Sequence, residues 1–126
     1  MIVVDTSALV ESLGAGGRLR GELRRAIEAG ERLVLPTLVL YEWLRGPRVD
    51  AELRAQEALM PAAQALPFGP EEASAAAGLY RDLPRSRGRS VDLAIAACAL
   101  TWDAALWTLN PDDFSDVPGL RLWDTG

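Results

Sequence analysis

Apolar and polar positions along the chain fall into blocks that predict short buried strands separated by helices. The first block, MIVV, is followed by segments whose apolar residues recur at helical spacing on one face. Gly and Pro residues stand between the blocks, where helices and strands end. The predicted strands cover 2–5, 32–36, 63–68, 105–109 and 120–123, and the predicted helices cover 6–13, 18–30, 38–46, 50–60, 70–83 and 91–102.

Strands that alternate with helices, mostly without tight hairpins, are typical of an α/β sandwich on a parallel sheet. The length of 126 residues suits one domain with a single core and is too short for two. The pattern contains no internal repeat and no linker. We therefore expect one α/β domain over residues 1–126.

The composition, 49% hydrophobic and 25% charged, is that of an ordinary globular protein. The N-terminus does not resemble a signal peptide, and no apolar run approaches the roughly 20 residues of a membrane helix. The single cysteine, Cys98, lies in an apolar segment and is expected in the core, without a disulfide. We expect a cytoplasmic protein with no membrane contact.

Two missing residue types narrow the possible chemistry. The chain has no histidine, which excludes histidine acid–base catalysis and histidine metal ligands. All thirteen basic residues are arginine, and the lack of lysine excludes a Walker-type phosphate site and Schiff-base catalysis. The net charge of −5 argues against a general nucleic-acid binder, but not against a nuclease with local arginines around an acidic pocket.

Acidic residues occur where an active site of an α/β protein is expected, beyond the carboxyl ends of the strands. Carboxylates that cluster there raise one another's pKa unless a cation joins them, and hard divalent cations such as Mg²⁺ prefer these oxygen ligands. The candidate positions are Asp5, Glu42, Asp92, Asn110, Asp112 and Asp113.

Most of these acids also have a purely structural explanation. Asp5 could cap the first helix, and Asp92 could complement the dipole of the helix that it begins. Asp112 and Asp113 could be turn residues after Asn-Pro. Glu42 is harder to explain in this way, because it is the single charge in an apolar helical stretch.

Four segments resemble a known family when they are taken together. They are MIVVDTSALV, PTLVLYEWLRG, SVDLAIAACAL and LWTLNPDDFSDVPGL. In order and spacing, and over nearly the whole chain, they are similar to PIN domains, specifically the ribonuclease toxins of VapC type. The resemblance implies a three-layer α/β/α sandwich with a short parallel sheet. It also implies an acidic pocket that binds Mg²⁺ or Mn²⁺ and hydrolyses RNA phosphodiester bonds.

The resemblance assigns roles to individual residues. Asp5 and Asp92 match metal ligands, and Glu42 matches the acid on the helix after the second strand; Glu42 and Asp113 are expected to join them as metal ligands. The fourth position is either Asn110, where many relatives have Asp, or Asp113, the acid before Phe114, and Asp113 is expected to supply the charge. The hydroxyls of Thr6 and Thr108 are expected to orient the cluster.

Without histidine or lysine, a metal-activated water is the available nucleophile for in-line attack on phosphorus. The expected products carry a 5′-phosphate and a 3′-hydroxyl. Arginines near the acids could hold the RNA backbone, although an arginine-rich loop is more often only solvated. These arginines are Arg45, Arg48, Arg85, Arg87 and Arg89.

Two other functions are compatible with parts of this pattern. A PIN-like domain with a degenerate pocket would be a binding or structural module, but its four polar positions are intact here. A Mg²⁺-dependent phosphatase of the haloacid dehalogenase type needs a second acid two residues after the first, where this chain has Ser7, and also a lysine. The phosphatase is therefore disfavoured.

The helices over 18–29, 37–45 and 50–60 have more apolar residues than a small core needs, with Tyr41 and Trp43 among them. Exposed apolar surface on a small domain indicates a protein interface. The resemblance implies two occupants, a second copy of the chain and the helical C-terminal segment of a VapB-like antitoxin. The alternative is a monomer whose helices only pack on the sheet.

Overall fold

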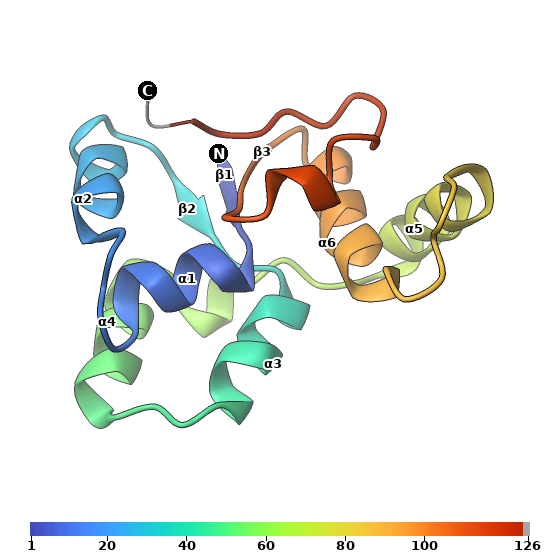
Figure 1. Cartoon of the computed structure of the whole chain (residues 1–126). Coiled ribbons are helices and arrows are strands. Elements are labelled where there is room, and N and C mark those ends of the chain that lie inside the picture. Colours follow the sequence, from blue (N-terminus) through green and yellow to red (C-terminus); the bar gives the residue numbers. More distant parts are fainter. Residues whose placement is uncertain (125–126) are drawn as a thin grey trace.

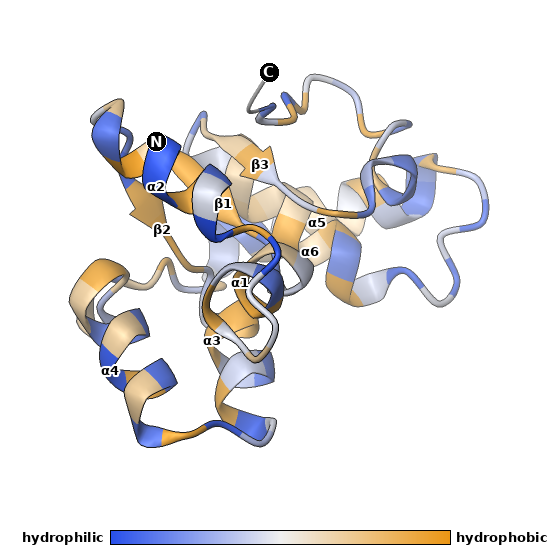
Figure 2. Cartoon of the chain, turned by 60° about the vertical axis from the view of Figure 1, so that its left-hand side comes forward, coloured by the Kyte–Doolittle hydropathy of each residue, from blue (hydrophilic) through white to orange (hydrophobic). Residues whose placement is uncertain are grey.

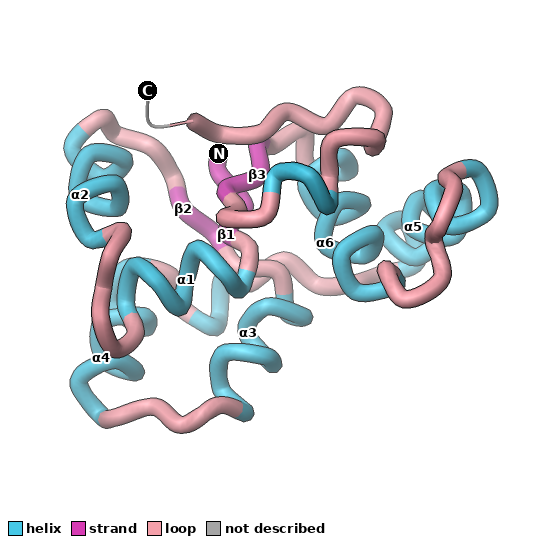
Figure 3. The backbone as a smooth tube through the Cα atoms, viewed as in Figure 1, coloured by secondary structure: helices cyan, strands magenta, loops and turns pink. Residues whose placement is uncertain are grey.

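A three-stranded parallel sheet lies at the centre of the computed structural model, which describes residues 1–124 (Figures 1 and 3). The strands β1 (Ile2–Val4), β2 (Leu33–Val34) and β3 (Ala105–Trp107) are arranged in the order β2-β1-β3. Ile2 pairs with Leu33 on one side and with Ala105 on the other. The predicted α/β class with a short parallel sheet is confirmed.

Two predicted strands, 63–68 and 120–123, are wrong. Each is reduced to one isolated parallel bridge, Leu66 with Pro36 and Leu122 with Leu106, and a 3₁₀ turn η1 (Ala62–Gln64) occupies the start of the first segment. Leu66 makes two backbone hydrogen bonds, to Leu35 and from Thr37. Pro67 follows and has no N–H with which to continue a ladder.

Six helices connect and cover the strands. They are α1 (Thr6–Leu13), α2 (Arg20–Glu28), α3 (Thr37–Arg45), α4 (Asp50–Leu59), α5 (Pro70–Asp82) and α6 (Ser90–Thr101). Helix α6 packs on β1 and β3 and is covered by α5, whereas α1 contacts α2, α3 and α4 on the opposite side of the sheet (Figure 1). Right-handed crossovers place α1 and α6 on opposite sides of the sheet, because the chain moves outward from β1 to β2 and then returns past β1 to β3.

The ends of the helices follow from local sequence. Gly30 adopts a positive φ of 79° just after α2, which ends that helix where the sequence predicted. Pro70 is the first residue of α5, and Glu72 accepts a hydrogen bond from the backbone of Gly69. Thr37 and Ser90 are the first helical residues of α3 and α6, and the N-cap positions are occupied by Pro36 and Arg89.

The core gathers side chains from the sheet and from the helices on both of its faces. Strand β2 is hydrophobic throughout, whereas α4 alternates between hydrophobic and hydrophilic turns (Figure 2). Cys98 is buried, as predicted, and burial raises the pKa of its thiol to about 12. Trp43, predicted as part of an excess apolar surface, is fully buried in this core, while Tyr41 is 61% exposed. Within residues 1–124, no helix has the length and apolarity that a membrane span requires.

Candidate functional site

Asp5 lies directly after β1 and is the N-cap of α1. Its Oδ1 accepts a 2.9 Å hydrogen bond from the backbone N–H of Thr6, and its Oδ2 accepts from the hydroxyls of Ser7 (3.1 Å) and Thr108 (2.8 Å). The pKa of Asp5 is raised, mainly by burial and further by the charge of Glu42, although the three hydrogen bonds lower it. Asp5 therefore caps a helix and is also a buried acid under charge repulsion.

Thr108 and Ser7 connect the end of β3 to the start of α1. The Ser7 hydroxyl accepts a hydrogen bond from the backbone N–H of Leu109, and the Thr108 hydroxyl accepts one from that of Asn110. Ser7 was not among the residues that the sequence predicted for the site. Its position two residues after Asp5, in the first helical turn, was the available signal that its hydroxyl reaches that carboxylate.

Glu42 projects from α3 toward the same corner of the sheet. Its Oε1 accepts a 2.7 Å hydrogen bond from the hydroxyl of Thr6, and its Oε2 lies 3.6 Å from Arg45. Thr6 thus donates to two acids, through its backbone N–H to Asp5 and through its hydroxyl to Glu42. The side chain of Glu42 is 24% exposed, which leaves it accessible to a ligand.

Asp92 is half-buried in the first turn of α6. Its pKa is raised mainly by burial and further by the charges of Asp5, Asp113 and Glu42, while Arg89 lowers it. The carboxylates of Asp5, Glu42 and Asp92, at α1, α3 and α6, therefore lie within electrostatic range of one another. Asp113, after β3, lies within range of Asp92. We refer to Asp5, Glu42, Asp92 and Asp113 as the acid cluster.

The acid cluster lies where the order of the strands reverses. The chain leaves β1 toward β2 on one side and toward β3 on the other, and Asp5 and Thr108 follow the carboxyl ends of β1 and β3. Ligands of open α/β sheets bind at this point.

The segment after β3 contains both candidates for the fourth position. Asn110 precedes a 3₁₀ turn, η2 (Pro111–Asp113), and Asn110 and Asp113 are both exposed. The Asp113 carboxylate is one of the charges that raise the pKa of Asp92. The backbone of Asn110 bonds to the hydroxyl of Thr108.

The five arginines expected to hold the RNA backbone differ in their surroundings. Arg48 stacks 4.1 Å from the ring centroid of Trp43 and donates to its carbonyl, and Arg45 lies over Tyr41. Arg85 and Arg87 are exposed, and neither forms an ion pair with any residue in the described part of the chain.

Arg85 also borders a cavity of about 410 Å³ beside the acid cluster. Arg89 forms part of the same wall and is held by contacts within the chain. The residues around this cavity are Arg85, Arg89, Asp112, Asp113, Ser115 and Asp116.

The donor set of the acid cluster is suited to a hard cation. Among residues 1–124, no three acidic or cysteine side chains converge closely enough to enclose a metal ion by themselves. Mg²⁺ binds through one or two carboxylates and keeps several waters, so a full cage is not required. Two oxygen-only acids that repel each other, Asp5 and Asp92, fit a hydrated Mg²⁺ or Mn²⁺ in this way.

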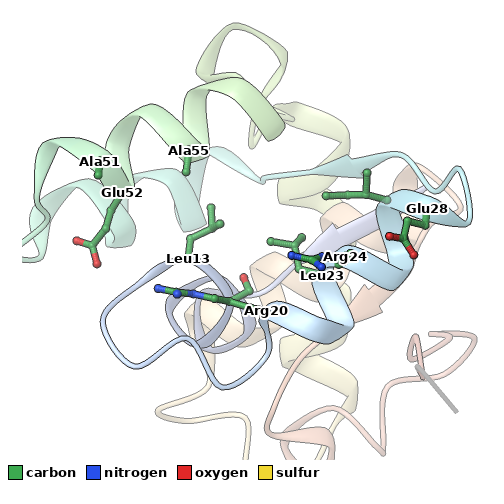
Figure 4. A pocket seen from close by; sticks show the side chains of 10 residues that line it. Leu13, Arg20, Leu23, Arg24, Glu28, Ala51, Glu52 and Ala55 are labelled. Carbon is green, nitrogen blue, oxygen red and sulfur yellow. The ribbon is translucent and has the colours of Figure 1, made fainter.

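A second and larger cavity, of about 600 Å³, lies between α1, α2 and α4, away from the end of α1 that carries Asp5 (Figure 4). Leu13, Leu23 and Ile27 provide apolar surface, and Ala51 and Ala55 of α4 face them with small side chains. Charged residues border this groove: Arg20, Arg24, Glu28 and Glu52. We call it the α1/α2/α4 groove.

Known structures share this fold at low sequence identity. DNA-bound VapBC from Salmonella typhimurium aligns with a TM-score of 0.74 and 19% identity, covering 99% of this chain and 98% of that chain. FitAcB from Neisseria gonorrhoeae aligns with a TM-score of 0.72 and 20% identity, over 99% and 98% of the two chains. VapBC2 from Rickettsia felis, bound to a promoter DNA fragment, aligns with a TM-score of 0.71 and 17% identity, covering 98% of each chain.

Comparison of the sequence with curated proteins gives no significant match. The family model described as PIN domain, however, matches residues 2–120, which is nearly the whole chain. The β2-β1-β3 parallel sheet and its flanking helices agree with that assignment. The chain belongs to the PIN domain family.

Proposed function

We propose that this protein is a metal-dependent endoribonuclease and the toxin of a VapBC-type toxin–antitoxin pair, acting in the cytoplasm. The observation that carries the proposal is that Asp5, Glu42, Asp92 and Asp113 lie within electrostatic range of one another at the point where the strand order reverses. Membership of the PIN family and the likeness to chains from VapBC and FitAcB complexes support it.

In this proposal Asp5 and Asp92 hold Mg²⁺ or Mn²⁺, with Glu42 and Asp113 at the edge of the site. When bound, the ion activates a water and neutralises charge on the phosphodiester. Thr6 and Thr108 keep the carboxylates oriented through their 2.7 and 2.8 Å hydrogen bonds. Asn110 is a further polar contributor at the mouth of the site.

Arginines around the site hold the RNA backbone. Arg85 and Arg87 are best suited to this role because they are exposed and form no ion pair within the described residues. Arg45 and Arg48 contribute from α3 and the loop after it, although each already contacts an aromatic ring.

The antitoxin is proposed to bind in the α1/α2/α4 groove (Figure 4). Small residues on α4 allow close approach of an amphipathic helix, and the apolar side chains of α1 and α2 would receive its apolar face. An arginine that extends from this partner to the acid cluster would replace the cation and inhibit cleavage. The net charge of −5 favours a basic partner segment.

A second copy of the chain is proposed as another partner. Tyr41 and Leu44 of α3 and Val91 of α6 are 61%, 52% and 46% exposed, which leaves apolar surface near the acid cluster uncovered. Light scattering of the isolated chain tests this. A dimer at micromolar concentration is expected, and a monomer would contradict the homodimer.

The activity itself is tested with the isolated chain on single-stranded RNA. Cleavage should stop in EDTA and return with Mg²⁺ or Mn²⁺, and the products should carry 5′-phosphates, read by direct ligation of their 5′ ends. Absence of cleavage with either metal would favour the alternative of a binding module. If cleavage is observed, sequencing of the 5′ ends of RNAs produced on induction of the protein would identify the RNA that is cut.

A further inference from the structure

Arg89, the residue before α6, uses most of its guanidinium for contacts within the chain. Its two terminal nitrogens donate to both carboxylate oxygens of Asp116, at 3.0 and 2.7 Å. They also donate to the backbone carbonyls of Pro84 (3.2 Å) and Asp113 (2.9 Å). The side chain is 18% exposed. Arg89 thus donates four hydrogen bonds from its five N–H groups, which leaves little capacity to bind an RNA phosphate.

These contacts connect the start of α6 to the segment after β3. Arg89 lies three residues before Asp92, and it binds the backbone of Asp113 directly. Asp92 and Asp113 interact electrostatically across this junction. Asp116 anchors the far end of the contact and lies outside the acid cluster.

We propose that Arg89 and Asp116 form a positioning pair that holds Asp113 opposite Asp92, so that the affinity of the acid cluster for a divalent cation depends on the two-pronged contact between them. The inference rests on the proposed function. It assigns to Arg89 a role different from the RNA contact that the sequence suggested.

The substitution Arg89→Lys distinguishes a role of Arg89 in positioning from a role of its charge. Lysine keeps the positive charge near Asp92 but lacks the planar fork that binds both oxygens of Asp116 and the carbonyl of Asp113 at once. If Arg89 acted only through its charge, Arg89→Lys would retain the cation affinity. If Arg89 acts by its geometry, Arg89→Lys should lose nearly as much cation affinity as Arg89→Gln.

The experiment measures the affinity of the full chain for Mn²⁺ alone, from the signal of free Mn²⁺ in electron paramagnetic resonance. Arg89→Gln, Arg89→Lys and Asp116→Ala should each weaken binding by about 10- to 100-fold, the range for residues that support metal ligands. The double variant Arg89→Gln/Asp116→Ala should be no weaker than the single variants by more than about twofold, because the two residues act as one unit.

Arg121→Gln is the matched control, because it removes another arginine that contacts an aspartate, Asp103, and a backbone carbonyl. It should leave Mn²⁺ affinity unchanged. Amide hydrogen exchange over residues 110–116 should be faster in Arg89→Gln than in Arg121→Gln.

Unchanged Mn²⁺ affinity in folded Arg89→Gln, wild-type affinity in Arg89→Lys, or additive losses in the double variant would each overturn the positioning pair. Wild-type protein that binds Mn²⁺ but cleaves no RNA would refute the nuclease while the comparison of variants stays readable. Wild-type protein that binds no Mn²⁺ would refute both.

Discussion

The hydroxyl of Thr6 donates a 2.7 Å hydrogen bond to Glu42, a residue 36 positions away on another helix. The backbone N–H of Thr6 also donates to Asp5, so that Thr6 sets the geometry of two acids. Thr6→Val keeps the backbone donor and the branched shape but removes the hydroxyl. We expect RNA cleavage to fall by about 10-fold or more, as for other residues that orient metal ligands.

Thr101→Val, at the opposite end of α6 from Asp92, is the control for this substitution. It should leave the rate of cleavage unchanged. Equal rates in Thr6→Val and in the wild type would show that Glu42 needs no fixed orientation.

The raised pKa of Asp5 predicts how the stability of the metal-free protein depends on pH. Asp5 in the folded state binds its proton more tightly than in the unfolded state, where its pKa is near 3.8. Folding is therefore favoured by this group below pH 3.8, and that contribution is lost as the pH rises through the raised pKa. Asp92 acts in the same direction, because its pKa is raised too.

Asp5→Asn removes this titration. Its free energy of unfolding in EDTA, relative to that of the wild type, should increase as the pH rises from about 4 to 7. Urea denaturation at several pH values measures the difference. A constant difference across this range would show that Asp5 has an ordinary pKa.

The fourth position of the site is decided by two substitutions. Asp113 interacts electrostatically with Asp92, whereas the backbone of Asn110 only bonds to Thr108. Asp113→Asn should therefore cost more activity than Asn110→Ala. Initial rates of RNA cleavage compare the two, and the reverse order would assign the position to Asn110.

The α1/α2/α4 groove predicts a site for disrupting the antitoxin. Ile27 borders it and is 42% exposed, so Ile27→Glu should not unfold the chain. The substitution should, however, prevent copurification with the proposed antitoxin, expressed from the gene next to that of this chain. Trp102→Glu, at a similarly exposed position after α6, is the control and should copurify normally. Retention of the partner by Ile27→Glu would place the antitoxin elsewhere.

The sequence predicts the fold class well because apolar blocks and helix signals are local. It fails where pairing depends on neighbours, as at 63–68 and 120–123, where only one bridge forms. It also misjudged Trp43, since a helix pattern does not show which of two apolar faces meets the core.

The candidate site was only partly readable from sequence. Asp5 and Asp92 could be selected because they follow predicted strands or begin helices. The contacts of Ser7 with Leu109 and of Arg89 with Asp116 could not, because they join positions 102 and 27 residues apart. Such contacts follow from the order of the strands and from the path of the chain after β3.

We propose that Asp5 and Asp92 form the cation site at which RNA is cleaved. The most direct measurement is the rate of cleavage of single-stranded RNA as Mn²⁺ is added to the EDTA-treated chain, for the wild type and for Asp92→Asn. Activity should rise with Mn²⁺ in the wild type, and the folded variant should lose at least about 100-fold of it. Full activity in EDTA, or equal rates in the two proteins, would contradict it.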